Sequence, residues 1–171
     1  MPKVLLAGQS LAVMSENPHS DFLVRPFHTG DGGAVVRMVT ALAAFHGDTA
    51  RIDEDLLARD AGGASPWIRI LIAEADGTLI GYAAFAPLHH LQYSRRGLDM
   101  HHLFVAEAWR GKGVGSALVE AGAALARSLD CGWLSVGADA ENRAAQDFYL
   151  ARGFAMHPYF GVRLRRLLAG D

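Results

Sequence analysis

The segment with the most evident chemistry is a glycine-rich loop at residues 110–116, which reads Arg-Gly-Lys-Gly-Val-Gly-Ser. It follows a strand-like segment and precedes an amphipathic helical pattern. Glycine lets the backbone approach a ligand closely, and the start of a helix offers unpaired N–H groups at the positive end of its dipole. Arg110 and Lys112 add full charges beside these groups. The loop therefore predicts an anion site, with a diphosphate as the natural ligand.

Two better-known phosphate-binding loops do not fit this spacing. A P-loop has Gly-x-x-x-x-Gly-Lys followed by Ser or Thr, whereas here Lys112 precedes the last glycine. The dinucleotide-binding fingerprint, Gly-x-Gly-x-x-Gly, belongs to a first strand, whereas this loop comes after residue 100 and has the spacing Gly-x-Gly-x-Gly. Taken by itself, the loop could also be a tight turn whose glycines only allow close packing.

Two histidine pairs, His89-His90 and His101-His102, raise the question of a metal site. Adjacent residues on a strand point to opposite faces, so neither pair is expected to chelate as a unit. One residue from each pair could still meet across neighbouring strands. Zinc sites usually need three or four ligands with supporting hydrogen bonds, and no further cluster in the sequence supplies them. No metal is expected.

The composition is that of an ordinary globular chain. Its 171 residues are 51% hydrophobic and 20% charged, and the net charge of −2 gives no indication of a nucleic acid or an anionic membrane as partner. No apolar run reaches the ~20 residues of a membrane-spanning helix. The one cysteine, Cys131, cannot form an intrachain disulfide, so a cytoplasmic location and a core position for this residue are expected.

Periodicity predicts alternating strands and helices that pack in layers as a mixed α/β domain. Strands are expected at 22–27, 67–74, 79–86, 99–105 and 132–138, and helices at 34–45, 53–59, 114–129 and 142–151. Asp76-Gly77 predicts a hairpin turn, and Gly153 predicts a left-handed cap after the last helix. Residues 154–167 suit one or two closing strands. Residues 1–20 are expected to be an N-terminal extension and residues 21–171 a single domain.

Two segments together resemble the GNAT superfamily of acyl-CoA-dependent N-acetyltransferases. Leu103-Phe104-Val105, followed after four residues by the glycine loop, is similar to the family's fourth strand and its [RQ]-x-x-G-x-[GA] motif. Residues 142–154 are similar to its second signature, N-x-x-A-x-x-F-Y-x-x-x-G-F. The strong resemblance covers residues 98–155, and this region is similar to that of spermidine/spermine N-acetyltransferases.

The resemblance implies an α/β fold (α+β mixed), the GNAT fold. Its central sheet is mixed, mostly antiparallel, has six or seven strands, is splayed between strands 4 and 5, and is flanked by about four helices. The implied cosubstrate is acetyl-CoA, whose pantetheine arm would pair with strand backbone and whose diphosphate would meet the loop amides. The implied contacts are Phe104, Val105, Arg110, Gly111, Lys112, Gly113, Val114, Gly115, Ser116, Asn142 and Arg152.

Acetyl transfer to an amine requires groups that move protons. An alkylammonium has a pKa near ~10, so a base must take a proton from the nitrogen. The resemblance places Tyr149 beside the CoA sulfur, as the acid for the departing thiolate. It places His101 where relatives have a glutamate or a histidine, which makes His101 the candidate base, with Asp99 as its partner or alternative and water as a third choice. On a regular strand, Asp99, His101 and Leu103 would share one face, and His102 would face the other layer.

The implied reaction is direct attack on acetyl-CoA, in a ternary complex, by a primary amine of a small molecule or peptide. Residues 88–97 could equally be a solvated turn or part of the substrate site, and if they line the site, their basic character suits an acceptor with a negative group better than a polyamine. Two other functions stay open: a non-catalytic acyl-CoA-binding module, and a metal-dependent hydrolase that uses the histidines. Members of the family often dimerise, so a homodimer is one expected oligomeric state.

Overall fold

The computed structural model describes residues 21–157. The chain divides after Gly137 into two compact units, and of the described elements only α4 lies in the second. The strands are β1 (Leu23–Pro26), β2 (Arg69–Ala75), β3 (Thr78–His90), β4 (Arg95–Val105) and β5 (Cys131–Val136). The helices are α1 (Gly32–Phe45), α2 (Glu54–Ala61), α3 (Val114–Ser128) and α4 (Arg143–Leu150), with 3-10 turns η1 (Thr29–Asp31), η2 (Leu91–Tyr93) and η3 (Glu107–Trp109).

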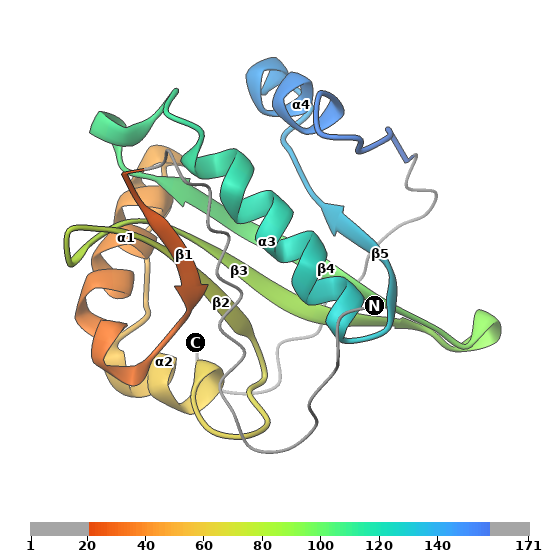
Figure 1. Ribbon diagram of the computed structural model, residues 1–171, viewed down its shortest axis with the longest axis horizontal. Helices are drawn as coiled ribbons and strands as arrows, with labels where there is room; N and C mark the ends of the chain where they lie inside the picture. The colour runs from red at the N-terminus through yellow and green to blue at the C-terminus, as the bar shows by residue number, and fades with distance from the viewer. Residues whose placement is uncertain (1–20, 158–171) are drawn as a thin grey trace. The chain divides into compact units, whose positions relative to one another are not determined.

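The first unit is built on a mixed sheet with the strand order β1-β2-β3-β4-β5 (Figure 1). Neighbouring strands are antiparallel except β4 and β5, which run parallel. Asp76 and Gly77 have left-handed φ values of 46° and 73°, which form the predicted tight turn between β2 and β3. The hairpin of β3 and β4 is longer than predicted, because its pairing continues to His90 and Arg95.

Helices cover both faces of this sheet (Figure 1). Tyr82 and Ala84 of β3 point to the face covered by α1 and α2, whereas Phe85 points to the face crossed by α3. The core between α1, α2 and the sheet consists of Val35, Met38, Leu57, Ile70, Ile72, Tyr82 and Ala84. Helix α3 follows β4 in the chain, so the loop that leads into α3 starts from the end of β4.

The pairing of β3 with β4 contains a β-bulge at His101. Ala84 pairs with His102 and Phe85 pairs with Met100, so His101 has no partner in β3. Cross-strand partners share a face, which places His102 and Asp99 on the α1 face, opposite Ala84 and Ala86, and places Leu103 on the α3 face, opposite Ala83. The predicted sharing of one face by Asp99, His101 and Leu103 is therefore wrong, because the inserted residue shifts the alternation by one position.

The parallel pairing of β4 with β5 ends at Met100, directly before the bulged residue His101. It runs from Arg96 with Cys131 to Met100 with Val136. Beyond Met100, β4 continues from His101 to Val105 without a β5 partner among the described residues. Among the described residues, the sheet is therefore open on the β5 side of β4 beyond Met100.

The described residues form five strands, fewer than the six or seven expected. Of the segment expected to form closing strands, residues 154–157 are not in a strand, and the rest lies outside the described residues. The expected N-terminal extension, residues 1–20, also lies outside them. The four expected helices are present within residues 21–157.

Gly122 sets how closely α3 approaches the sheet, and we expect Gly122→Ala to be destabilising. An added Cβ would lie 2.6 Å from two ring carbons of Phe85, so α3 would have to move away, at a cost of roughly 1–3 kcal/mol. Helix propensity alone favours alanine over glycine by about 1 kcal/mol, so a loss of stability isolates the packing effect. Urea denaturation measures it, with Gly30→Ala as the control, because no atom lies within 4 Å of a Cβ at Gly30. A variant as stable as the parent chain would contradict the close packing.

Candidate active site

The glycine loop forms the turn that starts α3. Gly111 and Gly113 have φ values of 75° and 86°, a left-handed conformation that side chains with a Cβ rarely adopt. Gly113 is the N-cap of α3, and the first bond of the helical ladder runs from the Ala117 amide to the Gly113 carbonyl, 3.0 Å away. The ladder therefore begins at Ala117, and the amides of Val114 and Gly115 lie before its first bond. This geometry is suited to binding an anion at the helix start.

The two cationic side chains of the loop lie against neighbouring groups of the same unit. Arg110 donates from Nε to the Val105 carbonyl, 3.2 Å away, and so ties the loop to the end of β4. The Lys112 ammonium lies 4.9 Å from the centroid of the Trp109 ring. Val114 is buried, so its side chain anchors the helix and only its backbone can contribute to a ligand site. Both charges remain exposed at the loop.

The open edge of β4 begins where the bulge occurs and ends at the loop. Phe104 packs against Tyr82, with ring centroids 6.1 Å apart, so its side chain belongs to the core and its backbone faces the open edge. Val105 pairs with Gly81 on the β3 side, and its carbonyl already accepts from Arg110. An extended ligand arm lying along β4 would therefore reach the glycine loop at Val105, where Arg110 would be its first cationic neighbour.

The imidazoles of His101 and His102 lie side by side at the start of this open edge. Their ring centroids are 4.8 Å apart, which contradicts the expected placement of the two rings on opposite faces and follows from the bulge. The ring of His101 is exposed, yet desolvation lowers its pKa below the ordinary value, while attraction from the Asp99 carboxylate acts against this shift. His101 is therefore a neutral imidazole at neutral pH, as a base requires.

Two further groups near the histidines were not found by sequence reasoning. The Tyr82 hydroxyl lies 3.1 Å from Nδ1 of His102, and Tyr82 is fully buried. The Ser135 hydroxyl of β5 donates to Oδ1 of Asp99, 2.8 Å away, across the Asp99–Ser135 pair of the parallel strands. Only the strand register brings these residues together. The one available signal in the sequence was therefore the alignment of β3 and β5 on either side of β4. Asp99 is thus fixed by a hydrogen bond rather than free to move.

The second unit carries the remaining candidate residues on and around α4. Asn142 is the N-cap of this helix, and its Oδ1 accepts from the Ala145 amide at 3.0 Å. Tyr149 lies between the rings of Phe148 and Phe154, at centroid distances of 5.1 and 5.5 Å, and burial raises the pKa of its phenol. The Arg152 guanidinium lies over the Phe148 ring, 3.5 Å from its centroid. A phenol with a raised pKa stays protonated at neutral pH, which suits an acid.

The remaining histidines of the described part of the chain do not assemble a metal centre. Within residues 21–157, no group of three or more His, Cys, Asp or Glu side chains could hold a metal ion. His89 and His90 pair with Arg96 and Arg95 in the long hairpin, and the His90 ring also lies against the Trp133 ring, with centroids 4.7 Å apart.

The basic hairpin tip is far from the bulge. A strand rises about 3.3 Å per residue, so Arg95 lies roughly 20 Å along β4 from His101. A small acceptor at the bulge would not reach the basic hairpin tip.

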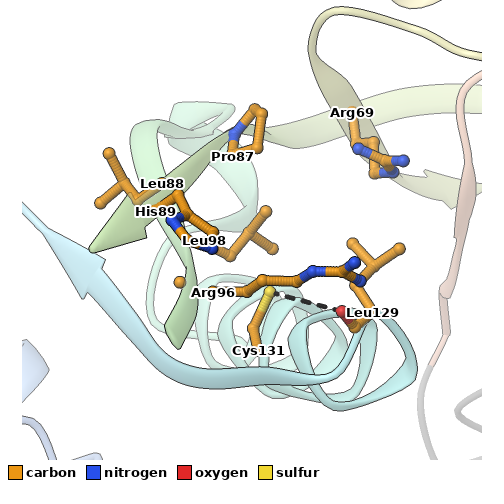
Figure 2. A pocket seen from close by; sticks show the side chains of 9 residues that line it. Arg69, Pro87, Leu88, His89, Arg96, Leu98, Leu129 and Cys131 are labelled. Carbon is orange, nitrogen blue, oxygen red and sulfur yellow. Dashed lines mark hydrogen bonds between the residues drawn. The ribbon is translucent and has the colours of Figure 1, made fainter. Parts of the chain in front are cut away.

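A separate pocket of about 410 Å³ lies beside the start of β4 and β5 (Figure 2). It is mainly apolar, with Arg69 and Arg96 among its lining residues, and Leu129, the C-cap of α3, forms part of its wall. The glycine loop lies at the other end of α3, whose 15 residues span about 22 Å. Burial raises the pKa of the Cys131 thiol in its wall, which argues against a reactive thiolate. This pocket is therefore not part of the site at the glycine loop.

Comparison with known proteins identifies the family. The sequence model of the Acetyltransferase (GNAT) family matches residues 35–154, and the chain belongs to this family. The resemblance predicted from the glycine loop and the second signature is thus confirmed, and the chain is an acetyltransferase.

Curated relatives and solved structures agree with this assignment. The chain is 28% identical over 144 residues to thialysine N-epsilon-acetyltransferase of Bos taurus, covering 77% of this chain and 82% of the relative. The same enzyme of Sus scrofa is 27% identical over 141 residues, with the same coverage of 77% and 82%. Among solved structures, ribosomal-protein-alanine N-acetyltransferase from Brucella melitensis biovar Abortus 2308 shares the fold with a TM-score of 0.66, at 21% identity and coverage of 85% and 99%. None of the helices among residues 21–157 has both the length and the apolar character that a bilayer crossing requires.

Gly113→Val should abolish detectable acetyl-CoA binding if the loop holds the diphosphate. No protein atom lies within 4 Å of a Cβ at this position, so the new side chain would occupy the space in front of the α3 amides. Its left-handed φ of 86° adds a conformational cost of roughly 1–2 kcal/mol, which Gly77→Val shares at a φ of 73° in the β2–β3 turn. Calorimetric titration with acetyl-CoA of both variants therefore separates strain from ligand crowding. Unchanged affinity in Gly113→Val would exclude the loop as the diphosphate site.

Proposed function

We propose that this chain transfers the acetyl group of acetyl-CoA to a primary amine of a small molecule or peptide, by direct attack in a ternary complex. The observation that carries the proposal is the junction of two features: the open edge of β4 from His101 to Val105, and the glycine loop that opens α3 directly after it. The named activity of the mammalian relatives, acetylation of thialysine at its ε-nitrogen, supports an amino-acid-like acceptor with a terminal amine.

The loop residues hold the cosubstrate in this proposal. The amides of Gly111, Gly113, Val114, Gly115 and Ser116 face the diphosphate, with the charges of Arg110 and Lys112 beside it. The backbone of Phe104 and Val105 pairs with the pantetheine arm, as an added strand would. In the second unit, Asn142 and Arg152 flank the cosubstrate in addition to their contacts within and around α4.

The neutral amine attacks the thioester carbonyl, and His101 takes a proton from its nitrogen as the new bond forms. The nitrogen lone pair forms the new bond to the carbonyl carbon, and the carbonyl oxygen becomes an oxyanion that a backbone amide of β4 stabilises. Collapse of the tetrahedral intermediate breaks the carbon–sulfur bond, and the Tyr149 hydroxyl protonates the departing thiolate. Asp99, held by Ser135, favours the protonated form of His101 and is the alternative base.

The proposal also covers the domain bounds, the location and the oligomeric state. Residues 21–171 act as one acetyltransferase domain with a sheet of six or seven strands, and residues 1–20 precede it as an extension. The single cysteine supports a reducing, cytoplasmic location, and a homodimer is the oligomeric state expected from the family. Light scattering of the purified chain measures its mass and decides between monomer and dimer.

The test of the function is an amine panel assayed by release of the CoA thiol. We expect turnover with thialysine or lysine analogues and a weaker response to polyamines such as spermidine. A chain that only binds acyl-CoA would raise its melting temperature with acetyl-CoA and never release thiol with any amine. That result would show that the chain is a non-catalytic acyl-CoA-binding module and not an enzyme. A clear preference for polyamines would reject the amino-acid-like acceptor.

Tyr149→Phe is the matched variant for this assay. It removes one hydroxyl and keeps the ring between Phe148 and Phe154, so we expect acetyl-CoA binding to be retained. Turnover should fall by about 10²-fold or more, in the range that general acid catalysis contributes. Equal turnover in the two proteins would remove Tyr149 from the acid role.

His101→Ala should change how the rate depends on pH. The rate with the parent chain should rise as the pH passes upward through the lowered pKa of His101, because only the neutral imidazole accepts a proton. The variant should lose that rise and retain roughly 10⁻² or less of the turnover. A kcat profile measured from pH 5 to 9 gives the comparison, and an unchanged profile would move the role to Asp99 or water.

A further inference from the structure

Tyr82 places a polar group in the core beside His102, the neighbour of the candidate base His101. The side chain is fully buried between β3 and α1, and its hydroxyl lies 3.1 Å from Nδ1 of His102. A buried hydroxyl without a partner is costly, so a phenylalanine would be the simpler residue for this position if only packing mattered. The contact between the two side chains therefore needs an explanation beyond the core.

The direction of this hydrogen bond follows from the partners available. Among residues 21–157, Nδ1 of His102 is the one hydrogen-bond partner of the Tyr82 hydroxyl. The hydroxyl proton must therefore point to Nδ1, because it would otherwise be buried without an acceptor. A neutral imidazole has one acceptor nitrogen and one donor nitrogen, so Nε2 of His102 carries the hydrogen.

The charge states of both groups agree with this arrangement. Burial, together with His101 and His46, lowers the pKa of His102 to about 4, and burial raises the pKa of Tyr82. Both groups are therefore neutral at neutral pH. Protonating His102 would put a second positive charge beside His101, whose ring centroid is 4.8 Å away.

The bulge makes His102 the neighbour that orients His101. His101 has no β3 partner and lies beyond the last β4–β5 pair, so the strand gives it less support than any residue before it on β4. The His102 ring, tilted by 52° to that of His101, lies against it from the core side. His102 is in turn held by a tyrosine that the core does not allow to move.

We propose that Tyr82 and His102 are a positioning pair for the acetyl-transfer reaction, in which the buried Tyr82 hydroxyl fixes His102 as the neutral Nε2–H tautomer and His102 holds the His101 imidazole at the bulge without adding a charge. The kinetic part of this proposal rests on the proposed function, and the tautomer part does not. An imidazolium at residue 102 would repel the positive charge that develops on the attacking nitrogen and oppose the transfer of its proton to His101. A neutral donor in the same place orients the base and leaves its basicity intact.

The tautomer is tested by nitrogen NMR on the chain labelled with ¹⁵N-histidine. In the parent protein at pH 7 we expect His102 to show a protonated Nε2 and an unprotonated Nδ1, and in Tyr82→Phe a mixture of both tautomers. Tyr93→Phe makes the same chemical change at a side chain that is 66% exposed at the hairpin tip, and should leave the His102 signals unchanged. An Nδ1–H tautomer, or an imidazolium, in the parent protein would overturn the proposal whether or not the chain is active.

The positioning role is tested by kinetics with an accepted amine. Tyr82→Phe should lower kcat about tenfold, as expected for a misplaced base, with the KM for acetyl-CoA within about twofold. His102→Gln retains an uncharged side-chain donor and should keep more activity than His102→Leu, with melting temperatures confirming that both are folded. A kcat of the parent value in both His102→Leu and Tyr82→Phe would overturn the positioning role. Absence of turnover in the parent protein with every amine would instead count against the proposed function, and the tautomer result would still stand.

Discussion

The site depends on the place where β4 loses its neighbour β5 and where one residue, His101, also lacks a partner in β3. The bulge removes the β3 partner of His101, and β5 pairs with β4 only as far as Met100. Backbone N–H and C=O groups require partners, so an interior strand with a free edge is a stretch of sheet that can accept another extended chain. The same five residues connect the histidines at one end to the glycine loop at the other. One interruption of the sheet thus creates both the binding edge and the position of the candidate base.

The core holds this interruption in place from both faces. On one face, Tyr82 and Phe104 stack and join the cluster under α1, which fixes β4 on the far side of the bulge. On the other face, Gly122 allows α3 to lie directly on Phe85, which pairs with Met100 just before the bulge. Arg110 then ties the loop back to Val105. The helix start and the strand end are therefore held relative to each other by packing that surrounds the open edge.

The elements of this fold follow from local sequence, whereas the details of the site do not. Helical periodicity located α1 and α3, Asp76-Gly77 located the β2–β3 turn, and the paired motifs identified the family. The bulge at His101 was not predicted, because the regular alternation of strand side chains between two faces assumes that no extra residue is inserted. The Ser135–Asp99 and Tyr82–His102 hydrogen bonds escaped because each depends on a register between strands far apart in sequence. The long hairpin was underestimated because Pro87 and the charged residues after it do not look like strand.

The lowered pKa of His101 constrains the order of events in the proposed reaction. A free alkylammonium with a pKa near ~10 holds its proton more tightly than an imidazole below its ordinary value of 6.5, so attack comes from the small fraction of the acceptor that is already a neutral amine and has a lone pair. The nitrogen becomes far more acidic as its lone pair forms the bond to the carbonyl carbon. A weak, neutral and well-oriented base is therefore best used when proton transfer accompanies bond formation, and its orientation then matters more than its basicity. This is the physical reason why a fixed, uncharged His102 beside His101 suits acetyl transfer better than a second titrating imidazole.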